Sequence, residues 1–405
     1  MKGLLRLKDR MTFRSVFFNK KLAVTLWFGL SIIAILQNIF ILRKFNNFLI
    51  FRQAYFHAVE KTNLYLLYPQ QYFDVYLYGP VFSVLIAPFA LLPLWLGVSC
   101  WVLFNVGFLY YALRKLPVQQ QWQFALLIFC SNEMMGHSAW LQANAAVCAC
   151  LVLAFALVRK EKEVWALLFI MLATFVKIYG IVGLAFFLLS KNKVKFIMWG
   201  IVWAVVCFFA PLLITNWSFL IQSYHDWYAA LQHKSAKNID VTIGYTSQDI
   251  SVMGFIRRVF YHRLDDLFVL VPAALLQVSQ FVYYRYYKDL RYQLYLLASI
   301  LIFTVIFSNG SEAPTYIIAL PGMCIWYILQ PKTKRVNVFF AITFLFTTFC
   351  YSDIFTPYFR RYVAIPYSLK AVFPAVVWLI ILIQIHCKQF LKIPDPEKCR
   401  IRNIE

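Results

Sequence analysis

The chain has 405 residues, of which 62% are hydrophobic, 19% aromatic and 14% charged, and its mean hydropathy is +0.67. This composition excludes a soluble globular domain and predicts a polytopic membrane protein. The net charge of +22 does not indicate a nucleic-acid partner, because the basic residues form short clusters between apolar runs. Lipid offers the backbone no hydrogen-bond partners, so the spans must be helices and the fold class is all-α.

Long apolar runs follow one another along the chain and predict about 10–12 transmembrane or re-entrant helices. The run 163–190 carries Lys177 at its centre, and we expect it to form two short helices instead of one straight span. The first part of the run 80–113 contains Pro88 and Pro93 and is too short to cross a membrane alone. The other runs cover residues 22–42, 122–136, 139–158, 196–215, 267–284, 294–308, 315–330, 336–354 and 371–391.

Basic clusters at the N-terminus, in alternate connections and at the C-terminus hold 26 of the 39 lysines and arginines. The positive-inside rule therefore predicts that both termini are cytoplasmic. The first apolar run is long and lacks a small-residue cleavage site, so we expect a retained anchor and not a signal peptide. The expected organisation is a basic tail at 1–21, a membrane domain at 22–391 with external loops 43–79 and 216–266, and a tail at 392–405.

Three groups of motifs occur in order between residues 40 and 330. The first is a polar, aromatic loop that leads into a proline-containing segment, from Asn47 through Tyr68-Pro69 and Tyr78-Gly79-Pro80 to Ala87-Pro88 and Pro93. The second is Leu141-Gln142-Ala143-Asn144, an apolar helix, the basic turn 159–162 and a second apolar helix ending at Lys177. The third is Thr246-Ser247-Gln248-Asp249-Ile250-Ser251, followed by Gly254 and Arg257-Arg258.

This order resembles glycosyltransferase family 87, bacterial membrane enzymes that take a sugar from a polyprenyl-phosphate donor. The chain departs from the family pattern at three positions. Asn47 occupies the usual position of the catalytic acid, Leu141 stands where glycine is frequent, and Tyr179 stands where proline is common. An amide has no useful protonation equilibrium at neutral pH, so Asn47 cannot act as a base.

The resemblance implies a helical bundle of the GT-C type, located in the bacterial inner membrane. It also implies transfer of a hexose, most often mannose in the family, from a polyprenyl-phosphate donor to a glycolipid or glycan acceptor at the outer face of the bilayer. We expect no nucleic-acid partner, no cofactor and no metal, because cationic side chains can stabilise a departing lipid phosphate.

Transfer to a hydroxyl group requires a base, so an external carboxylate is expected in the active site. Asp74 is the first candidate because it lies just before the chain re-enters the membrane at Pro80, and Glu312 and Glu60 are the others. The candidate substrate-binding residues are polar or basic side chains near the motifs: Asn47, Arg52, His137, Gln142, Asn144, Lys177, Gln248, Arg257 and Arg258.

Structural alternatives remain open for each candidate at this point. Asp74 also suits an ordinary loop, Lys177 a pairing with a backbone carbonyl, and the arginine pairs contact with lipid headgroups. His137, with Asn132 and Glu133, suits a polar cluster facing the same cavity as Gln142 better than a metal site. For the whole chain, the alternatives are a transporter or flippase of a lipid-linked saccharide, or a family member that has lost catalysis.

Overall fold

The computed structural model describes residues 16–240, 248–352 and 354–393, and within these ranges the chain is helical and contains no strand. The all-α prediction is therefore confirmed, while most of the two tails expected at 1–21 and 392–405 falls outside the described residues. Five helical stretches are long and apolar enough to cross a membrane: 20–42, 94–113, 193–213, 267–286 and 369–386. Five shorter apolar helices accompany them, at 144–158, 163–176, 178–189, 290–306 and 313–329.

The elements follow the apolar runs closely. The first half of the chain forms α3 (Lys20–Leu36), η1 (Gln37–Leu42), α4 (Asn46–Glu60), α5 (Val81–Leu85), α6 (Ala87–Ala90), α7 (Leu94–Leu113), α8 (Gln120–Trp140), α9 (Asn144–Val158), α10 (Glu163–Val176) and η2 (Ile178–Leu189). The second half forms α11 (Lys193–Phe209), η3 (Ala210–Leu213), α12 (Trp217–Ile239), α13 (Val252–Val259), α14 (Leu267–Ser279), η5 (Gln280–Tyr286), α15 (Leu290–Ile306), η6 (Ala313–Thr315), α16 (Tyr316–Leu329), α17 (Lys334–Phe349), α18 (Pro357–Phe359), η7 (Arg360–Ala364), α19 (Leu369–His386) and η8 (Gln389–Lys392).

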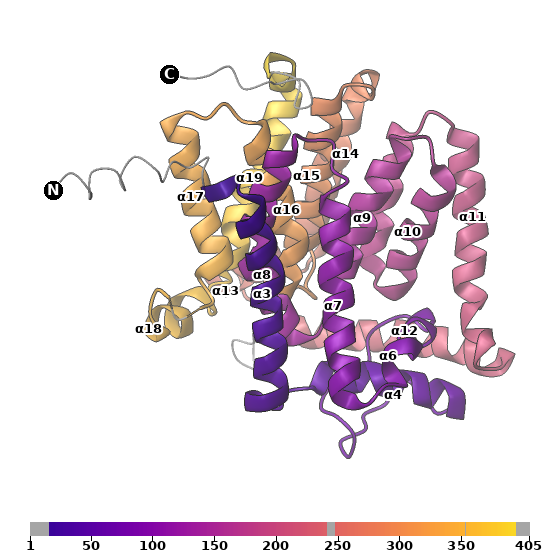
Figure 1. The fold of residues 1–405 in the computed structure, drawn as a ribbon. Coiled ribbons are helices and arrows are strands. Elements are labelled where there is room, and N and C mark those ends of the chain that lie inside the picture. Colours follow the sequence, from indigo (N-terminus) through magenta and orange to yellow (C-terminus); the bar gives the residue numbers. More distant parts are fainter. Residues whose placement is uncertain (1–15, 241–247, 353, 394–405) are drawn as a thin grey trace.

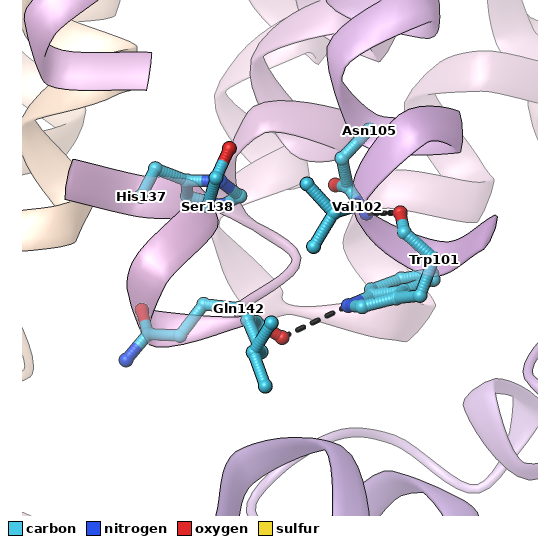
Figure 2. Close-up of a pocket in the computed structure, with 7 residues that line it drawn as sticks. Trp101, Val102, Asn105, His137, Ser138 and Gln142 are labelled. Carbon is cyan, nitrogen blue, oxygen red and sulfur yellow. Dashed lines mark hydrogen bonds between the residues drawn. The ribbon is translucent and has the colours of Figure 1, made fainter. Parts of the chain in front are cut away.

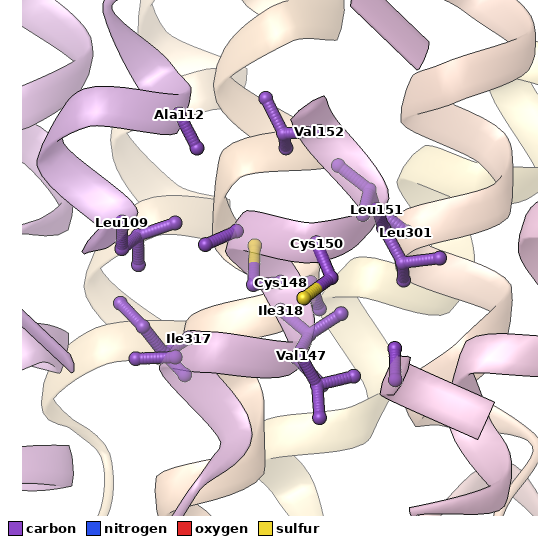
Figure 3. Packing of buried hydrophobic residues seen from close by; sticks show 14 of the residues in the cluster. Leu109, Ala112, Val147, Cys148, Cys150, Leu151, Val152, Leu301, Ile317 and Ile318 are labelled. Atoms are coloured by element: carbon purple, nitrogen blue, oxygen red, sulfur yellow. The ribbon is translucent and has the colours of Figure 1, made fainter. Parts of the chain in front are cut away.

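The centre of the bundle is α9, which is apolar all round and buried along most of its length. It packs against α7, α10 and α16. Figure 3 shows Cys148 and Cys150 of α9 among apolar side chains of neighbouring helices, such as Leu109, Leu301 and Ile317. Both cysteines are free and buried, so they serve as small apolar side chains in this packing.

Two breaks in the helices create the polar centre of the bundle. The apolar run 163–190 is divided at Lys177, whose extended backbone ends α10 before η2 begins, so the expectation of two short helices is confirmed. The boundary expected near residue 138 was wrong, because α8 continues through His137 to Trp140. The chain turns instead at Leu141, whose φ of 57° lies in the left-handed region and cannot continue a helix.

The segments expected as external loops contain helices. In Figure 1, α4, α6 and α12 lie across one end of the bundle, and the connections that precede α11 and α17 lie at the opposite end. These two connections carry basic clusters, as the positive-inside argument requires. The part of the run 80–113 before Pro93 forms only the short helices α5 and α6. Within this run, α7 is therefore the helix that is long enough to span a membrane.

Candidate active site

A chain of hydrogen bonds joins four polar side chains from three separate parts of the sequence. Lys177 Nζ donates to Asn144 Oδ1 at 2.8 Å, and Asn144 Nδ2 donates to Gln142 Oε1 at 2.6 Å. Gln142 Nε2 then donates to Glu312 Oε2 at 2.7 Å. Asn144 is buried, and the other three side chains are half-buried. The two breaks place Lys177 at the end of α10 and Gln142 just after α8, while Glu312 lies just before η6. A cation and a carboxylate therefore lie at the two ends of one polar chain.

Two aromatic rings lie beside the Lys177 ammonium group. The ring centroid of Tyr179 is 4.6 Å from Lys177 Nζ, and that of Tyr78 is 5.8 Å away. Both distances are within the range in which a ring face attracts a cation. The Tyr179 hydroxyl also lies 2.9 Å from Ser308 Oγ, so Tyr179 connects Lys177 with the loop that carries Glu312. An unpaired lysine at the centre of a membrane helix would cost about 2.5–3.5 kcal/mol. The structure provides Lys177 with one hydrogen-bond acceptor and two ring faces.

The first turn of α4 approaches the same region from the other side. Asn47 Nδ2 donates to the carbonyl of Trp140, two residues before Gln142, at 2.7 Å. The neighbouring Asn46 side chain pairs with both backbone groups of Phe73, at 2.7 and 2.8 Å. The family's usual acid position is thus adjacent to the turn that presents Gln142.

The helix α12 connects the two principal candidate acids. Lys234 Nζ forms an ion pair with Asp74 Oδ2 at 3.2 Å. The next residue, Ser235, accepts a hydrogen bond from Asn309 Nδ2 at 2.8 Å, three residues before Glu312. Together with the contacts of α4, these hydrogen bonds and the ion pair connect four segments in a ring. The four segments carry Asp74, Asn309–Glu312, Gln142 and Asn47.

The segment 43–79 forms a layer across one end of the bundle (Figure 1), and its tyrosines form the packed interior of this layer. Tyr65, Tyr72, Tyr76 and Tyr78 are all buried, whereas Tyr55 and Tyr68 are partly exposed. Burial raises the pKa of the Tyr65 and Tyr76 hydroxyls well above the ordinary value, so both remain donors, to the carbonyls of Tyr78 and Gly79. Packing against the protein interior therefore accounts for these four rings.

The turn at Gly79 fixes this layer to the end of α10. Gly79 N–H donates to the carbonyl of Val176, next to Lys177, at 3.1 Å. A Cβ atom at Gly79 would lie 1.9 Å from the Phe175 carbonyl oxygen, so only glycine allows the two backbones to approach this closely.

A small pocket behind the turn at Leu141 contains His137. Its lining residues are Trp101, Val102, Asn105, His137, Ser138, Leu141 and Gln142, and Figure 2 shows the hydrogen bond from Trp101 to the Leu141 carbonyl. His137 Nε2 accepts the backbone N–H of Ala145 at 3.1 Å. Glu133, one turn away, is bonded to Lys370 at 2.6 Å. His137 and Gln142 therefore share this pocket, as expected, and no group of three or more metal-ligating side chains occurs within the described ranges.

The candidate arginines of α13 are buried against protein groups. Arg257 forms ion pairs with Asp249, at 2.6 Å, and with Asp266. Arg258 donates to Ser368 and to the carbonyls of Gln248 and Ile365. Both guanidinium groups are buried, so these protein contacts take the place of the contact with lipid headgroups considered from the sequence.

The remaining candidates lie away from the chain of four polar side chains. Arg52 donates to the carbonyl of Ala90 and so joins α4 to α6, at 2.9 Å. Glu60 is exposed at the far end of α4. Asp74 is also exposed, with a φ of 74°, and contacts Lys234 and the backbone N–H of Val75.

A sequence model of glycosyltransferase family 87 matches residues 76–308, more than half of the chain. The chain belongs to glycosyltransferase family 87. It is therefore a membrane glycosyltransferase, and the expected family is confirmed. No curated protein gives a significant match to the sequence. The matched stretch includes Gln142, Asn144 and Lys177, whereas Asn47, Asp74 and Glu312 lie outside it.

Three residues that sequence reasoning did not select also belong to this region. Tyr179 was noted only as a departure from proline, although its ring and hydroxyl contact both sides of the region. Asn309 was not selected, because an asparagine followed by glycine is common in turns. Lys234 gave no signal, because a lysine on an external helix is ordinary in any membrane protein.

Proposed function

We propose that this family member transfers a hexose, with mannose the favoured sugar, from a polyprenyl-phosphate donor to a glycolipid or glycan acceptor. The reaction takes place at the outer face of the bacterial inner membrane, and both termini of the protein are cytoplasmic. One observation carries the proposal: a half-buried cation, Lys177, and a half-buried carboxylate, Glu312, are joined by the side chains of Gln142 and Asn144. A reaction that removes a proton and releases a phosphate needs these two charges.

Lys177 is the residue assigned to the donor phosphate. Its ammonium group has three N–H donors, and the bond to Asn144 uses one of them. A phosphate that leaves with the electron pair of the broken C–O bond gains negative charge, which a nearby ammonium group stabilises. Asn144 and the ring of Tyr179 hold the ammonium group in place for this contact.

Glu312 is the residue assigned as the base. As the acceptor oxygen forms its bond to the anomeric carbon of the donor sugar, the hydroxyl proton passes to the Glu312 carboxylate. Gln142 keeps this carboxylate oriented through the bond to Oε2. Asn47 lies next to the turn that presents Gln142, and Gln142 is bonded to Glu312. Glu312 therefore supplies, from another segment, the acid that the family usually has at the position of Asn47.

Asp74 is the alternative base. It is exposed and paired with Lys234, and it lies outside the chain of hydrogen bonds that joins Glu312 to Lys177. Glu60 and Arg52 lie on later turns of α4, and Arg257, Arg258 and Gln248 support the external segment, so these five residues have no direct role in the proposed reaction.

The test is a transfer assay with purified protein, radiolabelled polyprenyl-phosphate hexoses and membrane glycolipid extract. Glu312→Gln is expected to lower the transfer rate by about 10²–10⁴, the usual contribution of a positioned base, and to leave donor binding within about threefold. Asp74→Asn is expected to retain most of the rate. Glu161→Gln is the matched control, because Glu161 is an exposed partner of Lys191 in a cytoplasmic connection.

The outcomes separate the alternatives. A large loss in Asp74→Asn together with a near wild-type rate in Glu312→Gln would transfer the role of base to Asp74. If the wild-type protein transfers no hexose but Asn47→Asp does, the natural chain has lost catalysis. Movement of the intact lipid-linked saccharide between leaflets, without transfer, would support a flippase.

A further inference from the structure

The loop Ser308–Glu312 is held by the external segment through the side chain of Asn309. Asn309 Nδ2 donates to Ser235 Oγ on α12 at 2.8 Å and to Asp266 Oδ2, just before α14, at 2.9 Å. An amide nitrogen carries two N–H donors, so these two bonds use both of them. The backbone carbonyl of Asn309 accepts a further bond, from Asn238 Nδ2 at 3.0 Å.

Asp266 is itself fixed by a buried network of charges. Its second carboxylate oxygen is bonded to Arg257, and Arg257 also binds Asp249 at 2.6 Å. The Arg257 side chain is only 1% exposed. A charge at this depth is costly to leave unpaired, so the network has little freedom to move. Asn309 is therefore attached to a buried network of paired charges.

The backbone next to Glu312 is attached to the same segment. The Ser311 carbonyl accepts the N–H of Ile250 at 2.9 Å, and the Ile250 carbonyl accepts the Tyr316 hydroxyl at 2.9 Å. Glu312 N–H donates to Thr315 Oγ1 at 3.2 Å. Hydrogen bonds therefore hold the backbone at Asn309, Ser311 and Glu312, which leaves few freely rotating bonds between Asn309 and the carboxylate of Glu312.

We propose that Asn309 is a positioning residue, which sets the distance between the Glu312 carboxylate and Gln142 by attaching the loop Ser308–Glu312 to Asp266 and Ser235. This proposal rests on the function proposed for Glu312. Asn309 does not touch the substrates. Removal of its amide releases the loop from both partners and leaves a carboxylate oxygen of Asp266 without a donor.

The first experiment is a double-mutant cycle in the transfer assay. Asn309→Ala is expected to lower the maximal rate by about 10²-fold, the cost of displacing a reacting group by about 1 Å, with the donor KM within about threefold of wild type. Adding Asn309→Ala to Glu312→Gln is expected to cause no further loss, because the group that Asn309 positions is already absent. A donor KM raised in proportion to the lost rate, or additive losses in the double variant, would overturn the proposal.

The second experiment does not depend on transfer. The rate of alkylation of Glu312→Cys by a small hydrophilic maleimide is compared with and without Asn309→Ala, and we expect release of the loop to change it at least tenfold. An unchanged rate contradicts the positioning role, whereas absence of transfer by the wild type contradicts only the proposed function.

Ser235→Ala removes one of the two bonds and provides a milder variant if Asn309→Ala does not fold, with an expected threefold or larger change in the alkylation rate. A smaller change in this variant also overturns the proposal.

Discussion

At the scale of single residues, the charges of Lys177 and Glu312 are connected through other side chains, in contrast to the direct ion pair between Glu133 and Lys370. Lys177 and Glu312 are not bonded to each other, and two amide side chains lie between them. A direct ion pair would leave each charge neutralised and less available to a substrate. The amides hold both charged groups in place without neutralising them, as the proposed binding of a phosphate and a proton requires.

Tyr179 provides a test of the donor end of this chain. Tyr179→Phe retains the ring 4.6 Å from the ammonium group but loses the bond to Ser308, whereas Tyr179→Leu loses both. A cation–π contact contributes about 0.5–2 kcal/mol, so Tyr179→Leu is expected to weaken polyprenyl-phosphate binding by about 2–30-fold. Tyr179→Phe is expected to bind as the wild type does. The measurement is the dissociation constant for polyprenyl phosphate, and equal weakening by both variants would argue against a role for the ring.

At the scale of elements, the layer formed by the segment 43–79 depends on close backbone contact with the end of α10. The turn at Tyr78-Gly79-Pro80 reaches the carbonyls of Phe175 and Val176, so the layer and the break at Lys177 support each other. The helix α12 then attaches to the same layer, since Trp227 Nε1 donates to the Leu77 carbonyl at 3.0 Å.

Substitution of glycine tests this contact. Gly79→Ala places a methyl group 1.9 Å from the Phe175 carbonyl oxygen, and overpacking of this kind costs about 1–3 kcal/mol or more. We expect a lower thermal unfolding midpoint in detergent for this variant. Gly107→Ala, in α7, is the matched control: nothing lies within 4 Å of its Cβ position, and a helical glycine replaced by alanine gains about 0.5–1 kcal/mol. Equal midpoints for the two variants would contradict the close contact.

At the scale of the whole molecule, the two ends of the bundle differ in structure and charge. One end carries the crosswise helices α4 and α12, and the other carries short connections with basic clusters (Figure 1). This separation supports the proposed orientation, with α4 and α12 outside the cytoplasm.

Cysteine labelling in intact cells tests the orientation. Leu67→Cys and His233→Cys, each in a Cys387→Ser background, are expected to react with an impermeant maleimide without permeabilisation, because both positions are exposed at the end with α4 and α12. Native Cys387 is exposed beyond α19 and is expected to react only after permeabilisation. Labelling in the reverse order would show that the protein has the opposite orientation.

Local sequence alone predicted most of the helices and one of the two breaks. Apolar runs interrupted by prolines or basic clusters have few alternatives to membrane helices, because lipid cannot bond to a free backbone. Lys177 was also recognisable, since a lone lysine at the centre of an apolar run must end a helix or find partners. The turn at Leu141 was placed incorrectly, because leucine rarely adopts a positive φ and the family's usual glycine is absent.

Only the tertiary structure decided which polar residues belong together. Gln142 and Glu312 are 170 residues apart, and Asp74 and Lys234 are 160 apart. Hydropathy and helical periodicity are local properties and contain no information about such pairs, which depend on how α8, α10, α12 and the loop before η6 pack. For the same reason, the sequence ranked Asp74 above Glu312, and the bond from Gln142 is what brings Glu312 to the end of the polar chain.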